Sequence, residues 1–280
     1  MSNDDAFETE LVQLLGAHPL TLYLALLATL LVLAAGLWWA AHRYTVPRQT
    51  SRLPASVYLL IRLVSGFAIV VAAAAGFAEI AIELADGQRV GNLDLVFSSA
   101  VRQNLAAPAV RLFGWLTHLG DTLTLTSLCA GVALLLLARG RRLLALGWTL
   151  AIAGNSLLNV TLKGLFARTR PLHEGAPSLE QGFSFPSGHS SGSVVAYGML
   201  AYVLIRCLPP AQAARWSLPL VLAATALAFT IGCSRIFIQV HFATDVLAGF
   251  ASGTSWLAVC IVSIEWMRQA QRGKPDAIAA

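Results

Sequence analysis

The sequence predicts an all-α protein, a polytopic helical bundle in a membrane, from its composition and from the length of its apolar runs. Of the 280 residues, 57% are hydrophobic and only 12% are charged, whereas roughly a quarter of the residues in a soluble domain are charged. Several apolar runs approach or exceed the ~18 to 20 residues that a helix needs to cross the hydrocarbon core. Because these runs recur along the whole chain, the sequence indicates one membrane domain.

The apolar runs predict seven spanning helices. They lie at about residues 20–41, 56–80, 122–138, 144–162, 190–207, 217–233 and 246–264. Between the second and third runs, residues 93–117 mix apolar and polar side chains at helical spacing, which predicts an amphipathic helix at the membrane interface. The first run follows acidic residues and lacks a positively charged leader, so it is interpreted as a spanning helix and not as a cleaved signal sequence.

Basic residues between the spans predict the orientation of the bundle. They gather in alternate connections and after the last span, as at Arg43, Arg141, Arg206 and Arg268. The positive-inside rule places that side in the cytoplasm. The segments on the opposite side, facing the periplasm or outside, are the acidic N-terminal start, 86–120, 163–189 and 234–245.

The net charge of +5 is explained by these short basic segments and not by one basic face, so no nucleic-acid partner is expected. The four cysteines lie in or at the ends of apolar runs, where cysteine usually acts as a small hydrophobe. No zinc-protease HExxH pair, phosphate-binding GxxxxGK[ST] loop or dinucleotide fingerprint occurs in the sequence. We therefore expect no metal site and no cofactor.

Basic residues also lie on the predicted outer side, next to histidines at the ends of spans. Lys163 ends one span, and Arg170 follows it directly before Pro171, which stops the helix. Charges without partners are costly in a membrane protein, so cations at one depth indicate an anionic ligand. Lys163 can supply a point charge, and the planar guanidinium of Arg170 can bind two phosphate oxygens. When this segment is considered alone, a snorkelling lysine and an unrelated loop arginine are the better explanation.

A second candidate segment, Ser187-Gly188-His189, lies where an apolar helix begins. Free backbone N–H groups at a helix start, aided by the helix dipole, can bind phosphate oxygens, and glycine allows close approach. His189 would then stand beside the ligand. A serine cap with an interfacial histidine is the alternative.

The third candidate segment contains Arg235, His241 and Asp245. A four-residue spacing places the histidine and the aspartate on one face of a helix. A carboxylate that accepts from one imidazole nitrogen fixes the tautomer and leaves the other nitrogen basic, as a nucleophilic histidine requires. The alternative is a satisfied polar pair at a helix start.

Small residues offer a way to bring the two histidines together. Four-residue spacings that permit close helix packing occur at Gly188 and Gly192 and at Gly249 and Gly253. Inside the fourth predicted span, Asn155 and Asn159 are expected to make hydrogen bonds between helices.

In order and spacing, three motifs together resemble the signature of the type 2 phosphatidic acid phosphatase superfamily, the lipid phosphate phosphatases related to vanadium haloperoxidases, and more narrowly its bacterial membrane branch. The motifs are Lys-x6-Arg-Pro at 163–171, Pro-Ser-Gly-His at 186–189 and Ser-Arg-x5-His-x3-Asp at 234–245. The resemblance covers about residues 56–264. Gln239, Phe242 and Ala243 depart from it, since glycine, tyrosine and proline are often found there.

The resemblance implies a role for each motif residue. His241 would be the nucleophile that forms a phosphohistidine, Asp245 its orienting partner, and His189 the general acid. The residues that would bind phosphate are Lys163, Arg170, Ser187, Gly188 and Arg235. The family core has six helices and needs no metal ion, so the first of the seven spans would be an extra N-terminal helix.

The expected organisation is a segment at 1–55 with the extra helix, a membrane phosphatase domain at 56–266, and a polar tail at 267–280. The expected function is hydrolysis of a lipid phosphomonoester or diphosphate, such as phosphatidic acid, phosphatidylglycerol phosphate or undecaprenyl diphosphate, at the periplasmic face of the bacterial inner membrane. Two alternatives remain open: a lipid-linked phosphotransferase that uses the same intermediate, and a non-enzymatic protein that binds or transports lipid phosphates. Soluble haloperoxidases share the constellation but lack such apolar spans.

Overall fold

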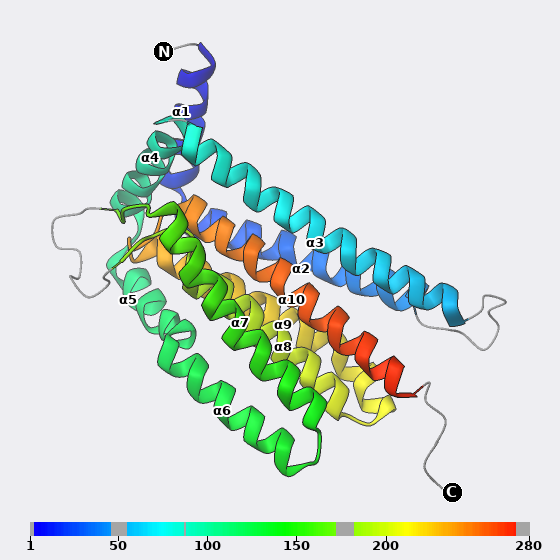
Figure 1. Cartoon of the computed structure of the whole chain (residues 1–280). Coiled ribbons are helices and arrows are strands. Elements are labelled where there is room, and N and C mark those ends of the chain that lie inside the picture. Colours follow the sequence, from blue (N-terminus) through cyan, green and yellow to red (C-terminus); the bar gives the residue numbers. More distant parts are fainter. Residues whose placement is uncertain (1–2, 46–54, 87, 172–181, 273–280) are drawn as a thin grey trace, which may run out of the picture.

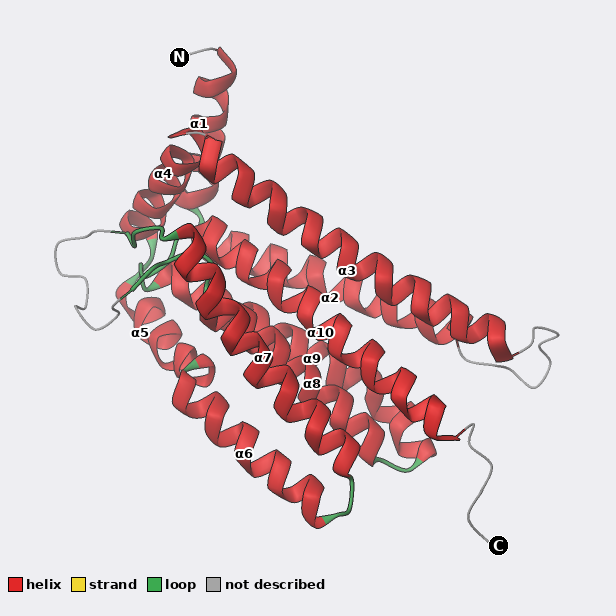
Figure 2. Cartoon of the chain, viewed as in Figure 1, coloured by secondary structure: helices red, strands yellow, loops and turns green. Residues whose placement is uncertain are grey.

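A computed structural model of the chain describes residues 3–45, 55–86, 88–171 and 182–272, and helices make up nearly all of this part (Figure 1). No strand occurs among the described residues (Figure 2). The predicted all-α class is therefore confirmed.

The helices follow one another with short connections. In chain order they are α1 (Asn3–Ala17), α2 (Pro19–Thr45), α3 (Ala55–Asp86), α4 (Gln88–Asn104), α5 (Ala107–Leu116), the 3₁₀ helix η1 (Thr117–Gly120), α6 (Thr122–Ala138), α7 (Arg142–Phe166), α8 (Gly188–Cys207), α9 (Pro210–Phe237) and α10 (Ala243–Arg272). Each of the seven predicted spans falls within one of these helices. The tail expected from residue 267 begins as the last turns of α10, and residues 273–280 lie outside the described part.

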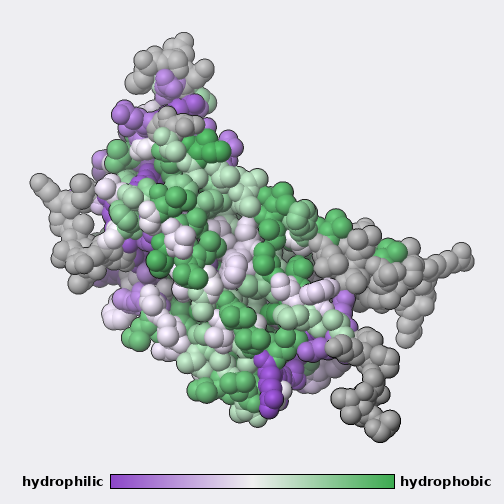
Figure 3. Space-filling view, in the orientation of Figure 1, coloured by the Kyte–Doolittle hydropathy of each residue, from purple (hydrophilic) through white to green (hydrophobic). Residues whose placement is uncertain are grey.

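Six helices of the described chain are long and apolar enough to cross a membrane, namely α2, α3, α7, α8, α9 and α10. The remaining predicted span, at 122–138, is α6, which is shorter than these six helices. Residues 107–120 and α6 form a pair that is bent by 42° and can together supply a seventh span. Hydrophobic side chains cover the middle of the bundle, and hydrophilic ones gather toward its ends (Figure 3). The chain is thus a multi-pass membrane protein.

The prediction of one continuous amphipathic helix over residues 93–117 is wrong. The structure has two helices there, α4 and α5, which are separated at Leu105 and Ala106. Pro108 explains the break, because it has no N–H to donate and its ring would clash with the carbonyl of Asn104 in a continuous helix. At the start of α5 the missing N–H costs nothing.

The motifs meet at one end of the bundle. α1, α4 and α5 lie at this end, together with the segments that join α7 to α8 and α9 to α10 (Figure 1). The connections from α6 to α7 and from α8 to α9 lie at the opposite end. In the centre, α8 packs against α7, α9 and α10, and a buried cluster that includes Trp148, Met199 and Ile264 fills the space between these helices.

Candidate active site

The third motif forms a hydrogen-bonded pair, as predicted, although its geometry differs from the expected one. His241 lies in the connection between α9 and α10, ahead of the helix, and Asp245 lies in the first turn of α10. Nδ1 of His241 is 3.3 Å from Oδ2 of Asp245, and both residues are almost completely buried. The pair therefore bridges a loop and a helix start instead of sharing one helix face.

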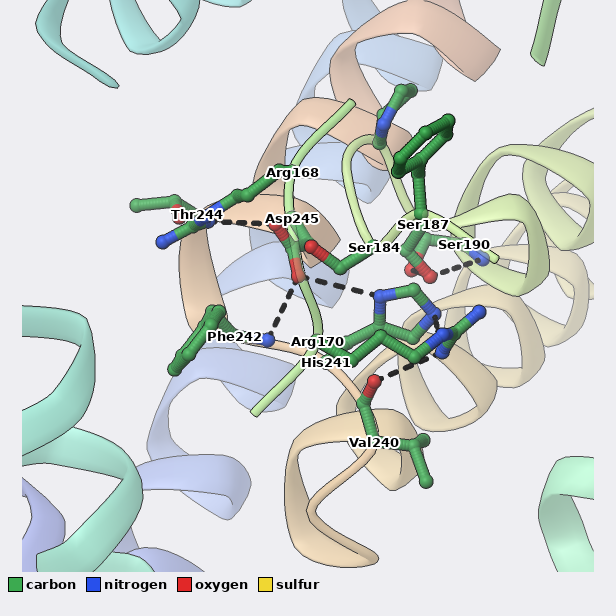
Figure 4. Close-up of polar contacts among 12 residues, drawn as sticks. Arg168, Arg170, Ser184, Ser187, Ser190, Val240, His241, Phe242, Thr244 and Asp245 are labelled. Atoms are coloured by element: carbon green, nitrogen blue, oxygen red, sulfur yellow. Dashed lines mark hydrogen bonds and ion pairs between the residues drawn. The ribbon is translucent and has the colours of Figure 1, made fainter. Parts of the chain in front are cut away.

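Arg170 fixes the tautomer of His241. Its Nη1 lies 3.2 Å from Nε2 of His241 and 3.0 Å from the carbonyl oxygen of Val240 (Figure 4). A guanidinium can only donate, so Nε2 of the imidazole accepts and Nδ1 carries the hydrogen that faces Asp245. Burial lowers the pKa of His241 to about 3, although Asp245 opposes this shift. The imidazole is neutral, with a lone pair on Nε2.

Asp245 is held from three sides. Besides His241, its Oδ2 accepts from the backbone N–H of Phe242 at 3.0 Å, and its Oδ1 accepts from Nη1 of Arg168 at 2.7 Å (Figure 4). A carboxylate with three donors and one cation partner is stabilised as the charged form. It can therefore orient the imidazole of His241.

Arg168 also binds Asp94, a contact that the sequence patterns did not reveal. Nη2 of Arg168 lies 2.8 Å from Oδ2 of Asp94 on α4, and Thr244 donates to Asp94 from its backbone N–H at 3.2 Å and from its hydroxyl. Burial raises the pKa of Asp94, while the bonds to Thr244 and Arg168 oppose that shift. Arg168 lies inside the first motif, two residues before Arg170, but nothing in the local pattern pairs it with a carboxylate 74 residues earlier.

The three predicted phosphate-binding cations lie within electrostatic range of one another. Nζ of Lys163 donates to the carbonyl of Phe183 at 2.6 Å, and Nη1 of Arg235 donates to Thr117 at 2.9 Å. Arg170 lies close enough to Lys163 and to Arg235 for their charges to repel. Burial lowers the pKa of Arg170, although Asp245 opposes the shift. An anion placed among these groups would relieve the repulsion.

The second motif caps α8 and joins the third. Ser187 is the N-cap, and its Oγ accepts from the backbone N–H and the hydroxyl of Ser190 at 3.4 and 3.0 Å. The expectation that the backbone N–H of Ser187 is free for an anion is wrong, because it donates to the carbonyl of Asp245 at 2.9 Å. This bond fixes the start of α8 against the start of α10.

Glycines on α10 permit this approach. A Cβ at Gly249 would lie 2.6 Å from the carbonyl oxygen of Ser187, and one at Gly253 would lie 2.8 Å from that of Ser191. The predicted close packing is thus confirmed for this pair. Gly188 and Gly192 face elsewhere, toward Asn159 of α7 and Leu125 of α6.

Both asparagines expected to join helices do so. Nδ2 of Asn159 lies 3.5 Å from the carbonyl oxygen of Pro186 and 3.4 Å from Oγ of Ser191, and Nδ2 of Asn155 lies 3.4 Å from the same hydroxyl. These bonds hold the first turn of α8, and the segment before it, against α7.

His189 pairs with a carboxylate that the sequence patterns also did not reveal. Its Nε2 lies 2.9 Å from Oδ1 of Asp121, and Oδ2 of Asp121 lies 2.7 Å from Nδ1 of His118. His189 is also within electrostatic range of Arg170 and Lys163. His189 and His241 thus approach one cationic site, each with an aspartate on one ring nitrogen.

Comparison with known proteins gives three findings. The sequence model of the PAP2 superfamily matches residues 142–269. Phosphatidylglycerophosphatase B of Bacillus subtilis (strain 168) is 39% identical over 105 residues, which is 37% of this chain and 50% of that protein. The match thus spans about half the length of that relative. The crystal structure of a transmembrane PAP2 type phosphatidylglycerolphosphate phosphatase from Bacillus subtilis is similar over 73% of this chain and 98% of that chain, with a TM-score of 0.65 and 28% identity.

Proposed function

We propose that the protein is a membrane phosphatase of the PAP2 superfamily, whose sequence model matches residues 142–269, and that it removes phosphate from a lipid through a phosphohistidine on His241. The observation that carries the proposal is the arrangement of Arg170, His241 and Asp245. It leaves a neutral imidazole whose Nε2 lone pair points at a phosphate-binding guanidinium.

The first step transfers the phosphoryl group to the protein. Nε2 of His241 forms a bond to phosphorus as the bond between phosphorus and the lipid oxygen breaks. His189, as imidazolium, gives its proton to that oxygen, so the lipid leaves as an alcohol. Protonation of a leaving group by a positioned acid contributes about 10² to 10⁴ in rate.

The second step releases inorganic phosphate. His189, now neutral, takes a proton from a water molecule, whose oxygen attacks phosphorus as the bond to Nε2 of His241 breaks. Lys163, Arg170 and Arg235 stabilise the negative charge on the phosphoryl oxygens in both steps, since charges already in place cost no reorganisation during the reaction. The backbone N–H of Gly188, at the first turn of α8, and the hydroxyl of Ser187 would add donors.

Phosphatidylglycerol phosphate is the substrate that we propose first. Its support is that the curated Bacillus subtilis relative and the similar Bacillus subtilis crystal structure are each described as a phosphatase for this lipid. Phosphatidic acid and undecaprenyl diphosphate present the same terminal phosphate to the same cations.

A substrate panel in the presence of a metal chelator tests the proposal. Purified protein in detergent is given equal concentrations of the three lipids, and both free phosphate and phosphorylated acceptor are measured. We expect phosphate release that the chelator leaves unchanged, fastest for phosphatidylglycerol phosphate. Transfer to an acceptor in place of release would contradict hydrolysis, and loss of activity with chelator would contradict a metal-independent reaction.

We also propose that the site faces the periplasm and that residues 56–266 form the catalytic unit, with α2 as an added helix. The proposed orientation is supported by the basic residues at the opposite end of the bundle, such as Arg139 and Arg141, whose side chains are exposed. Single cysteines at the exposed positions Ala106 and Arg139, in a background without native cysteines, test the orientation. An impermeant reagent should label Ala106→Cys in intact cells and Arg139→Cys only after lysis.

A further inference from the structure

The turn η1 brings a carboxylate to His189 from a part of the chain that precedes the PAP2 match. Asp121 lies between η1 and α6 and accepts from both His189 and His118. The exposed fraction of the side chain falls from 62% for His118 to 38% for Asp121 and 19% for His189. The three side chains therefore form a row that leads from the surface into the site.

Helix capping does not explain Asp121. This residue is the N-cap of α6, and an aspartate at that position commonly accepts from a backbone N–H of the helix. The side chain of Asp121 makes no such capping bond, and its two oxygens pair with imidazole nitrogens instead. The conformation of its side chain is therefore determined by its bonds to the histidines and not by helix capping.

The turn that carries Asp121 is fixed at three points. The bonds join Nη1 of Arg235 to Oγ1 of Thr117 at 2.9 Å, the hydroxyl of Tyr197 to the carbonyl of Leu119 at 2.7 Å, and the hydroxyl of Thr124 to the carbonyl of His118 at 2.8 Å. The turn also approaches His189 closely. A Cβ at Gly120 would lie 3.0 Å from Cδ2 of His189. The carboxylate is therefore held in place by structure around it.

The charges around His189 indicate an electrostatic role for Asp121. The cations that would bind phosphate also repel a positive charge on His189, since Arg170 and Lys163 both lie within range of it. A general acid must nevertheless carry a proton when the substrate arrives. A carboxylate 2.9 Å from Nε2 counteracts the repulsion.

We propose that Asp121 is the positioning residue of the general acid. It accepts from Nε2–H of His189, stabilises the imidazolium, and leaves Nδ1 as the nitrogen that faces the leaving oxygen. Nδ1–H gives its proton to the lipid oxygen in the first step, and Nδ1 takes one from water in the second. Asp121 stays charged throughout, and His118 holds its other oxygen. The inference rests on the proposed function.

Dependence on the leaving group separates this role from a structural one. The substrates are a long-chain alkyl phosphate and a nitrophenyl phosphate that bears the same chain, because a nitrophenolate leaves without needing a proton. The kcat/KM of each is measured for the full chain in detergent with chelator present. Asp121→Asn and His189→Ala should each lower kcat/KM for the alkyl phosphate by about 10²-fold or more, and far less for the nitrophenyl phosphate.

Three controls make the outcomes distinct. Glu83→Gln removes an exposed acidic charge from α3 and should leave kcat/KM for both substrates unchanged. His241→Ala should abolish turnover of both, and retained turnover in it would overturn the proposed function and this inference together. If His241→Ala is inactive but Asp121→Asn lowers kcat/KM equally for both substrates, or for neither, only the role of Asp121 is overturned. Wild-type activity lost to the chelator would instead show that turnover needs a metal ion, and would overturn both this inference and the metal-independent reaction proposed above.

Discussion

Arg168 and Asp245 form a buried ion pair directly behind the nucleophile, with Nη1 2.7 Å from Oδ1. The same guanidinium binds Asp94 of α4 through Nη2 at 2.8 Å and lies 4.4 Å from the centre of the Phe242 ring. One cation thus serves two carboxylates that are both buried. The charge balance behind His241 depends on a helix that the PAP2 match does not cover.

Loss of Arg168 should destabilise the protein, and loss of Asp94 should restore part of that stability. Arg168→Met leaves two buried carboxylates without their shared cation, which should lower the free energy of unfolding by about 3 to 5 kcal/mol. Adding Asp94→Asn removes one of the two charges. Unfolding in detergent should therefore show the double variant to be more stable than Arg168→Met alone. Equal stability, or a further loss, would mean that Asp94 is not balanced by Arg168.

Gln239 offers a test of the departure from the family motif. Its φ of 60° is left-handed, which costs a residue with a Cβ about 1 to 2 kcal/mol. Its side chain makes two bonds, since Oε1 accepts from Ser98 of α4 at 2.8 Å and Nε2 donates to the carbonyl of Ile236 at 2.9 Å, and each bond is worth about 0.5 to 1.5 kcal/mol. The strain and the bonds nearly cancel, so Gln239→Gly should change stability by less than about 1 kcal/mol. Gln239→Val keeps the strain, loses both bonds and should be clearly less stable. Melting temperatures in the reverse order would contradict this account of the loop.

Gly249 should be intolerant of even a methyl group. A Cβ there would lie 2.6 Å from a backbone oxygen of Ser187, which cannot rotate away, so Gly249→Ala should cost about 1 to 3 kcal/mol. Because the contact fixes the start of α8 beside His241, phosphate release should fall as well. Gly131→Ala is the matched control, since its Cβ meets open space and helix propensity favours alanine by up to about 1 kcal/mol. Similar behaviour of the two variants would argue against close packing of α8 on α10.

Acid should destabilise the folded protein through His241. The pKa of this imidazole is about 3 in the folded state, against 6.5 ordinarily. Between these values the unfolded chain binds a proton that the folded one does not, so the stability present above pH 6.5 is lost as pH falls. From pH 6.5 to 5 the loss should be about 2 kcal/mol at most, at 1.4 kcal/mol per pH unit.

The His241→Asn variant removes this contribution, while groups that do not contact His241, such as Asp94, titrate equally in both proteins. The free energy of unfolding of the wild type should fall more steeply over this pH range than that of the variant. Parallel pH dependences would show that His241 is not held neutral by burial.

Local patterns predicted what depends on local geometry. Apolar run length located the spans, helix ends located the motifs at one membrane face, and the spacing of His241 and Asp245 anticipated their bond. The spacing of Gly249 and Gly253 anticipated a close helix contact, although the partner surface on α8 could not be read from it. The break before α5 was not predicted, because the helical periodicity around Pro108 continues across it.

The supporting carboxylates could not be predicted in the same way. Asp94 and Asp121 reach their partners Arg168 and His189 across 74 and 68 residues. No periodicity in the sequence records such a pairing, because it is decided by how α4 and the bend before α6 pack against the bundle. In the sequence alone, each aspartate is indistinguishable from an ordinary polar residue at a helix end or on an exposed face.

Covalent trapping at His241 tests the central claim most directly. Protein is mixed with a lipid phosphate, quenched within the first turnovers under alkaline conditions that preserve phosphohistidine, and digested for mass spectrometry. We predict phosphate on His241, its absence from His241→Ala, and its depletion when quenching is delayed until substrate is exhausted. Turnover with no phosphate on His241 at any time, or phosphate on another residue, would contradict the account.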